Sequence, residues 1–177
     1  MPTYAYHLLD VFTDQPFGGN QLAVFPDAAG MPAEIMQRIA RELNLAETTF
    51  VLPPCSAESD FHVRIFTPAV EMPMAGHPTV GTADVLYRLG RFSGDRVRFE
   101  EGVGVIPVEI TGEPTRPLIW MDQPEPVLGP RFEDRGEKSK LRISLILLGK
   151  RSEKSRLAEK GQVYQWIRPH TGIRSDP

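Results

Sequence analysis

The segment from Val80 to Leu89 most constrains what this chain can fold into. If it forms a helix, apolar side chains surround almost its whole circumference, and Gly81 leaves room for close neighbours: the apolar positions are Val80, Ala83, Val85, Leu86 and Leu89. A helix that is apolar on nearly every side is buried rather than laid on a surface. We therefore expect an axial helix wrapped by strands, with its open N-terminus forming the floor of a site.

The residues that lead into this helix, from Glu71 to Gly81, have the composition of an anion-binding turn. Gly76 is expected to allow a backbone turn that other residues resist. Pro78 suits the first helical position, where its missing N–H costs nothing. The free N–H groups of that turn favour a negative charge and could hold a carboxylate beside the imidazole of His77. An ordinary strand-to-helix turn, with His77 as a local cap, explains the same residues.

The rest of the pattern is typical of an α+β domain. A helix is predicted over residues 32–43, ended by Asn44, because one apolar stripe recurs at helical spacing: Ile35, Met36, Ile39, Ala40 and Leu43. Strand-like segments cover residues 4–13, 21–25, 46–52, 61–66, 97–100, 103–110 and 118–122. We therefore predict a sheet that curls around the central apolar helix.

The composition argues against several classes of function. Hydrophobic residues make up 41% of the chain and the formal net charge is −3, which points to no polyanion and no membrane partner. No apolar run reaches eighteen residues, and the first residues do not have the pattern of a secretory signal. The single cysteine fits a reducing cytoplasm. The four histidines lack metal-ligand spacing, so no metal site is expected.

Charge and residue usage change near residue 136. Residues 1–130 contain 8 Arg, no Lys and 17 acidic residues, a net of −9, whereas residues 131–177 contain 12 Lys and Arg and 6 acidic residues, a net of +6. A basic interaction tail is one interpretation, and a foreign or frame-shifted end is the preferred one. Few aromatic residues are interleaved, so no nucleic-acid partner is expected. We predict a domain over residues 1–134 and a divergent, poorly ordered tail over residues 135–177.

Several long motifs occur in a fixed order along the first part of the chain. They are residues 10–13 (DVFT), 17–24 (FGGNQLAV), 36–45 (MQRIARELNL), 47–51 (ETTFV), 64–68 (RIFTP), 75–83 (AGHPTVGTA) and 120–124 (WMDQP), together with Glu71. With these motifs the sequence resembles the PhzF-like family of phenazine biosynthesis, whose fold is related to that of diaminopimelate epimerase. The resemblance covers about residues 3–134.

The resemblance implies a fold of two similar halves, each a sheet curled around a central helix, with the active site in the cleft between them. Family members are nearly twice as long as this chain, which therefore looks like the N-terminal half followed by an unrelated tail. In the family the second half supplies an aspartate and a further glycine-rich anion-binding turn. An inactive, truncated half-protein that binds a small anion or self-associates as a homodimer is therefore the alternative to an enzyme.

The resemblance also implies a chemistry: isomerisation of a small carboxylate-bearing substrate without a cofactor. Glu47 occupies the position of the glutamate that shuttles a proton, and partial burial could raise its pKa toward neutrality. His77 would hydrogen-bond the substrate or assist proton transfer. Residues 19 and 20 form one substrate-binding loop and residues 76, 78 and 79 the other: Gly19, Asn20, Gly76, Pro78 and Thr79.

Each of these assignments has a simpler structural interpretation. Glu47 could be a solvated or capping carboxylate, and Asn20 could only stabilise its own turn. Asp10 and Arg64 are expected to be structural charges. Epimerase and racemase relatives use a pair of thiols, one of them at the position of Ala75, and Cys55 lies in a polar turn away from the motifs. A two-thiol racemase is therefore the weaker hypothesis.

Overall fold

The computed structural model describes residues 3–13, 17–113 and 116–123 of the chain. These residues form a curled mixed sheet and two helices, which confirms the predicted α+β class. In chain order the elements are β1 (His7–Val11), β2 (Asn20–Phe25), α1 (Ala33–Leu43), β3 (Glu47–Leu52), β4 (Phe61–Phe66), β5 (Glu71–Met72), α2 (Gly76–Arg88), β6 (Arg96–Glu101), β7 (Gly104–Glu113) and β8 (Arg116–Met121).

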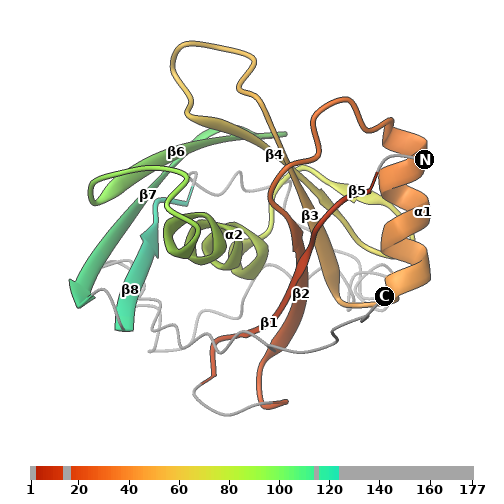
Figure 1. The fold of residues 1–177 in the computed structure, drawn as a ribbon, viewed down its shortest axis with the longest axis horizontal. Coiled ribbons are helices and arrows are strands. Elements are labelled where there is room, and N and C mark those ends of the chain that lie inside the picture. The colour runs from red at the N-terminus through yellow and green to blue at the C-terminus, as the bar shows by residue number, and fades with distance from the viewer. Residues whose placement is uncertain (1–2, 14–16, 114–115, 124–177) are drawn as a thin grey trace, which may run out of the picture. The chain divides into compact units, whose positions relative to one another are not determined.

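Two helical crossovers set the order of the strands. The sheet runs β1-β2-β3-β4-β6-β7-β8, with the short β5 paired to β4. The pairs β2/β3 and β4/β6 are parallel, and parallel neighbours require a crossover connection. The helix α1 lies in the first crossover and α2 in the second. Figure 1 shows the consequence: the strands curl around α2, whereas α1 lies on the outer side of the sheet.

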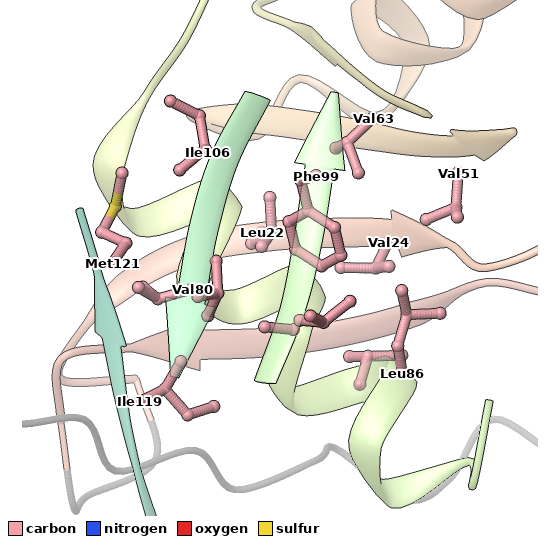
Figure 2. Packing of buried hydrophobic residues seen from close by; sticks show 14 of the residues in the cluster. Leu22, Val24, Val51, Val63, Val80, Leu86, Phe99, Ile106, Ile119 and Met121 are labelled. Carbon is pink, nitrogen blue, oxygen red and sulfur yellow. The ribbon is translucent and has the colours of Figure 1, made fainter. Parts of the chain in front are cut away.

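The helix α2 is the centre of the main core, as its apolar sequence predicts. Every residue from Pro78 to Leu86 is buried. The seven longer strands all direct apolar side chains toward this helix, including Leu22, Phe99 and Ile119, and Figure 2 shows them around Val80 and Leu86. Complete burial of one such side chain contributes roughly 1.5–3 kcal/mol, so this cluster supplies much of the driving force for folding.

Gly81 is the point at which α2 comes closest to the sheet. A Cβ atom at this position would lie 2.6 Å from Leu22 Cδ2 and 3.0 Å from Val11 Cγ2. Both neighbours are fully buried and have little room to move. The expected close approach at residue 81 is therefore confirmed, and it fixes the helix against β1 and β2.

The ends of α2 differ from the sequence prediction. The helix begins at Gly76 after the N-cap residue Ala75, so Pro78 is its third residue and not its first. Proline is tolerated there because no N–H of the first turn has an intrahelical partner. Leu89 was expected on the buried surface, but it follows the last helical residue and is 44% exposed.

The outer helix α1 builds a second, smaller core on the opposite face of the sheet. Met36 and Ala40 are buried against Phe25, Phe50 and other apolar residues. Asn44 ends the helix in the left-handed conformation, with φ of 51°, as expected. Ile35 was predicted to belong to the buried stripe but is exposed, because the face that meets the sheet is centred on Met36 and Ala40.

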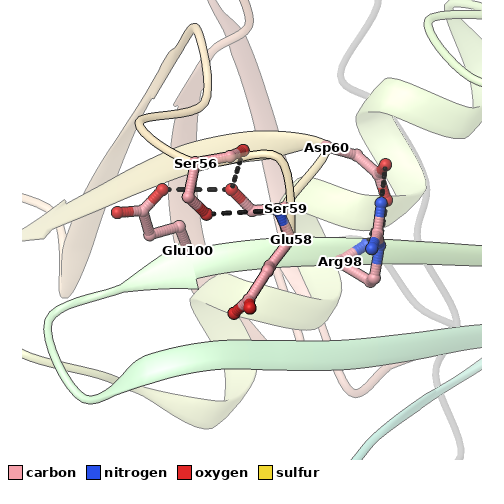
Figure 3. A network of polar contacts seen from close by, with 6 residues as sticks. All are labelled: Ser56, Glu58, Ser59, Asp60, Arg98 and Glu100. Carbon is pink, nitrogen blue, oxygen red and sulfur yellow. Dashed lines mark hydrogen bonds and ion pairs between the residues drawn. The ribbon is translucent and has the colours of Figure 1, made fainter.

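The loop between β3 and β4, residues 53–60, is held against β6 by polar contacts (Figure 3). Glu100 Oε2 accepts hydrogen bonds from the Cys55 N–H and the Ser59 hydroxyl, each at 3.0 Å. The Arg98 guanidinium binds both carboxylate oxygens of Asp60, at 2.9 and 3.2 Å. These exposed contacts position the loop far more than they stabilise the fold.

The predicted tail, residues 135–177, lies outside the described residues, as does the apolar segment 141–148. The boundary near residue 134 and the foreign origin of the tail therefore stay predictions.

Replacing Gly81 by alanine tests the packing of α2 on β2. The added methyl group overpacks the contact with Leu22, so Gly81→Ala should lower the free energy of unfolding by about 1–3 kcal/mol, measured by urea denaturation. Leu22→Ala alone should cost about 2–5 kcal/mol through the cavity it leaves. The double variant should cost clearly less than the two together. Strict additivity would show that the two side chains do not share this space.

Candidate active site

Glu47 and His77, which are thirty residues apart in the sequence, meet at the N-terminal end of α2. Glu47 is the first residue of β3 and His77 the second residue of α2. His77 Nε2 lies 3.0 Å from Glu47 Oε2, and the two side chains are 10% and 19% exposed, respectively. The sequence motifs named both residues separately, and the fold brings a carboxylate and an imidazole into contact.

The contact leaves hydrogen-bonding capacity unused. His77 Nε2 and Glu47 Oε2 are close enough for an ion pair, but they are not aligned for a hydrogen bond. Within the part of the chain that the structure describes, Glu47 Oε2 and His77 Nε2 are both buried without a hydrogen-bond partner. A hydrogen bond weakens steeply when it is misaligned, so this contact contributes little as a hydrogen bond. Two buried polar atoms in this state can each accept another partner.

A buried pair of hydroxyl groups sets the position of α2 along β3. Thr49 Oγ1 and Thr82 Oγ1 are 2.8 Å apart, and both side chains are completely buried. Alternate residues of a strand face the same side, so Thr49 and Glu47 both face α2. The hydroxyl bridge therefore fixes the register that places Glu47 opposite His77.

The first turn of α2 offers backbone donors next to this pair. No side chain caps the helix N-terminus, and its first turn contains no acidic residue. The Thr79 N–H donates to the Ala75 carbonyl, and Pro78 has no N–H. Among the described residues no partner is found for the N–H groups of Gly76 and His77. Two unpaired donors at a helix N-terminus favour an anion.

Pro78 and Thr79 support this turn from inside. Both residues are buried. The Thr79 hydroxyl lies 2.7 Å from the Ala75 carbonyl oxygen and 2.6 Å from Glu101 Oε1. Their side chains have no surface for a ligand, so their expected substrate-binding role is limited to holding the turn.

The reason for a glycine at position 76 differs from the one expected. Gly76 is helical and does not have a positive φ. The nearest atom to an added Cβ would be Gln123 Nε2, at 3.8 Å. The missing side chain leaves free space between the helix terminus and the Gln123 amide, which follows β8. Apart from its place in the WMDQP motif, nothing in the sequence pointed to Gln123.

The loop between β1 and β2 carries Gly19 and Asn20. A Cβ at Gly19 would lie 2.3 Å from the Val11 carbonyl oxygen, a backbone atom that cannot move aside, so glycine is required there. Asn20 is exposed and opens β2 opposite Val11. The Phe17 N–H donates to Asp10 Oδ2 at 2.8 Å, which agrees with the structural role expected for that aspartate.

Phe12 connects this loop with the Glu47–His77 pair. Its ring lies 6.4 Å from the imidazole of His77 in an edge-to-face arrangement, and its φ is 64°. A positive φ is costly for a bulky residue, so the surrounding structure holds it there. The sequence prediction missed Phe12 as a wall of the site, because only its backbone conformation turns the ring toward His77.

Arg64 and Glu71 orient the segment before α2. The guanidinium forms two hydrogen bonds to the carboxylate, both of 2.7 Å, between β4 and β5. A paired arrangement of this kind fits the structural role expected for Arg64.

A sequence model of the PhzC-PhzF family, described as phenazine biosynthesis-like protein, matches residues 9–163. The chain belongs to this family. The match continues past residue 134, where the resemblance was expected to end. The described helix α2 and its partner strands form one half of a diaminopimelate epimerase-like fold.

Two curated relatives illustrate the similarity of this PhzF-family chain. It is 50% identical over 107 residues to an uncharacterised isomerase of Mesorhizobium japonicum, which covers 60% of this chain and 35% of that protein. It is 40% identical over 146 residues to the trans-2,3-dihydro-3-hydroxyanthranilate isomerase of Pseudomonas aeruginosa. The match covers 82% of this chain and 50% of that protein. The chain therefore spans half or less of the length of these relatives.

Solved structures share the fold. A PhzF-family phenazine biosynthesis protein of Bacillus anthracis is 36% identical with a TM-score of 0.62, over 68% of this chain and 40% of that one. A probable proline racemase of Agrobacterium radiobacter is 16% identical with a TM-score of 0.52, over 66% and 41% of the two chains. The second likeness shows a common fold only.

Thiol chemistry has no support at the site of this PhzF-family chain. Ala75 stands at the position where the racemase relatives were expected to have a thiol. Cys55 is exposed in the loop before β4, and its pKa is raised, first by desolvation and then by the charge of Glu100. A raised pKa keeps the thiol protonated and unreactive.

In the described residues no group of three His, Cys, Asp or Glu side chains could hold a metal ion. No described helix has the length and hydrophobicity to span a membrane.

The hydroxyl bridge between β3 and α2 can be tested with valine substitutions. Thr82→Val leaves the buried Thr49 hydroxyl unpaired and should cost about 1–3 kcal/mol in free energy of unfolding. The double variant Thr49→Val/Thr82→Val should recover part of this loss, because both polar groups are removed. Urea denaturation of the two single variants and the double variant measures the coupling. A double variant as destabilised as the sum of the single ones would contradict the bridge.

Proposed function

We propose that this chain carries the proton-transfer centre of a cofactor-independent isomerase that acts on a small carboxylate-bearing substrate. The observation that carries the proposal is the contact of 3.0 Å between His77 Nε2 and Glu47 Oε2, beside the uncapped N-terminus of α2. A proton carrier (Glu47), a hydrogen-bonding ring (His77) and two backbone donors then lie together at the N-terminus of α2. Membership in a family of isomerases supports the same chemistry.

In the proposed reaction Glu47 acts first as a base and then as an acid. Its carboxylate removes a proton from a carbon that is activated by a neighbouring double bond or carbonyl group, and the electron pair moves into the conjugated system. The carboxylic acid formed on Glu47 then returns the same proton to another carbon. Atoms and charge balance, because only the position of the double bond changes. No redox partner is required.

The neighbouring groups bind and stabilise the substrate in this scheme. The N–H groups of Gly76 and His77 hold its carboxylate at the positive end of the helix dipole. His77 Nε2 hydrogen-bonds the oxygen on which negative charge accumulates during proton removal. Phe12 and the loop of Gly19 and Asn20 form the wall next to the ring. The edge-to-face contact of Phe12 with His77 supports this placement.

The chemical class of the substrate follows from the relatives. The Pseudomonas aeruginosa relative is named for trans-2,3-dihydro-3-hydroxyanthranilate, a compound with a carboxylate group. We propose a substrate of the same class for this chain, because an anion-binding helix terminus suits a carboxylate.

A second function is favoured by the length of the chain. Because it spans half or less of its relatives, it could bind the carboxylate without turning it over, or two copies could pair and complete a cleft. Binding without turnover, together with a dimer in solution, would support this second function over the first.

Substituting Glu47 by glutamine removes the proton carrier and keeps the size of the side chain. Glu47→Gln should abolish turnover of trans-2,3-dihydro-3-hydroxyanthranilate, which is followed by chromatography. Its circular dichroism and thermal unfolding should stay close to those of the unmodified protein.

Glu42→Gln is the matched control, because Glu42 is exposed on α1, on the other face of the sheet. It should leave turnover unchanged. Turnover that survives Glu47→Gln removes Glu47 from the mechanism. A chain with no turnover at all leaves the binding function, which calorimetry with the same compound then measures.

A further inference from the structure

A second carboxyl group, that of Glu101, lies beneath the turn that carries His77, and the proposed reaction does not use it. Glu101 is the last residue of β6 and is 4% exposed. Its Oε1 lies 2.6 Å from the Thr79 hydroxyl, and its Oε2 is buried without a partner among the described residues. A buried carboxyl group with a single polar neighbour needs an explanation.

The hydrogen-bond distances around Thr79 indicate that Glu101 is protonated. The Thr79 hydroxyl has one proton but lies within 2.7 Å of two oxygens, the Ala75 carbonyl and Glu101 Oε1. The carbonyl oxygen can only accept, so one of the two contacts lacks a proton if Glu101 is ionised. Both contacts are satisfied when Glu101 is protonated, because it then donates to Thr79, and Thr79 donates to Ala75.

The backbone next to Glu101 also packs on this turn. A Cβ at Gly102 would lie 2.8 Å from Pro73 Cα and 3.0 Å from the Pro73 carbonyl oxygen. The end of β6 therefore contacts this turn twice: the Glu101 side chain meets Thr79, and the main chain at Gly102 packs on Pro73. Ala75 is the N-cap residue of α2, and the two residues that follow it supply the free N–H groups and the imidazole.

We propose that Glu101 is a positioning residue, whose protonated carboxyl group holds the N-terminal turn of α2 in place through a hydrogen-bond chain from Glu101 to Thr79 to the Ala75 carbonyl. Loss of the proton breaks this chain and frees the turn that presents His77 and the backbone donors. The link to substrate binding rests on the proposed function, whereas the hydrogen-bond chain itself does not.

The surroundings of Glu101 favour the protonated form. Burial raises the pKa of Glu101 to about 7, and only a Thr79 hydroxyl that donates to the ionised carboxylate would oppose this increase. Glu101 lines a cavity of about 400 Å³. The other charged or titratable residues that line it are His62 and Arg64 from β4, Glu71 from β5 and Glu100 from β6. The charge of Arg64 is matched by Glu71 at 2.7 Å.

The stability of the protein should depend on this proton. The folded state keeps it up to about pH 7, whereas the unfolded chain releases it near the ordinary value of 4.5. Between these two values the folded state binds more protons, so stability falls as the pH rises and then levels off above pH 7. Glutamine at position 101 can donate to Thr79 at every pH, so Glu101→Gln should remove this contribution.

The test is an NMR titration of the full chain between pH 4 and 9. The side-chain carboxyl ¹³C signal of Glu101 should titrate near pH 7, and the amide signals of Gly76 and His77 should shift with the same midpoint. The amide shifts should disappear in Glu101→Gln. In Thr79→Val the Glu101 signal should still titrate, but the amides should no longer follow it. The measurements are repeated in a His77→Asn background, which removes the imidazole that lies next to these amides.

Two results would overturn the proposal: a Glu101 carboxyl that titrates below pH 5, or amide shifts that persist unchanged in Glu101→Gln. The first is read in the unmodified protein and therefore does not depend on whether the variant folds. Where the chain turns substrate over, kcat/KM should fall above pH 7 and this fall should be absent in Glu101→Gln. A chain without turnover contradicts the proposed function but leaves the titration result intact.

Discussion

The close contact between α2 and the sheet is the constraint on which the rest of the structure depends. Gly81 allows the helix to lie against β1 and β2, and the curled strands then enclose its apolar side chains. A helix held on all sides cannot slide or turn, so its N-terminus stays at one place relative to β3. The position of His77 opposite Glu47 follows from this packing and from the hydroxyl pair of Thr49 and Thr82.

The same packing makes the first turn of α2 chemically unusual. Most helices satisfy their first N–H groups with a side-chain cap. In α2 no side chain of the described residues does so, and the turn is held from below by Thr79 and Glu101 instead. This arrangement costs stability, because buried atoms of Glu47, His77 and Glu101 have no hydrogen-bond partner within the described part of the chain. It leaves the helix terminus, the imidazole and the carboxylate of Glu47 ready to bind a ligand.

The sequence predicted the buried helix from its apolar periodicity, and the motifs identified Glu47 and His77, whereas only the fold shows that the two side chains meet. It misplaced Pro78, since any position of the first turn tolerates a residue without an N–H. It misread Gly76, whose lack of a side chain provides space rather than a special backbone angle. Phe12, Gln123 and Glu101 could not be identified, because they reach the helix terminus only through long-range strand pairing and a positive φ.

Two carboxyl groups near one helix terminus have environments that separate their roles. Glu47 is partly exposed and contacts an imidazole, an environment that suits the proton transfer proposed for it. Glu101 is buried beneath the turn with a hydroxyl as its polar neighbour, and burial favours its neutral form. A neighbouring carboxyl group that stays protonated, here Glu101, would benefit a site that transfers protons. It would hold the turn in place while the charge on Glu47 changes. The inner carboxyl would set the geometry, and the outer one would carry out the transfer.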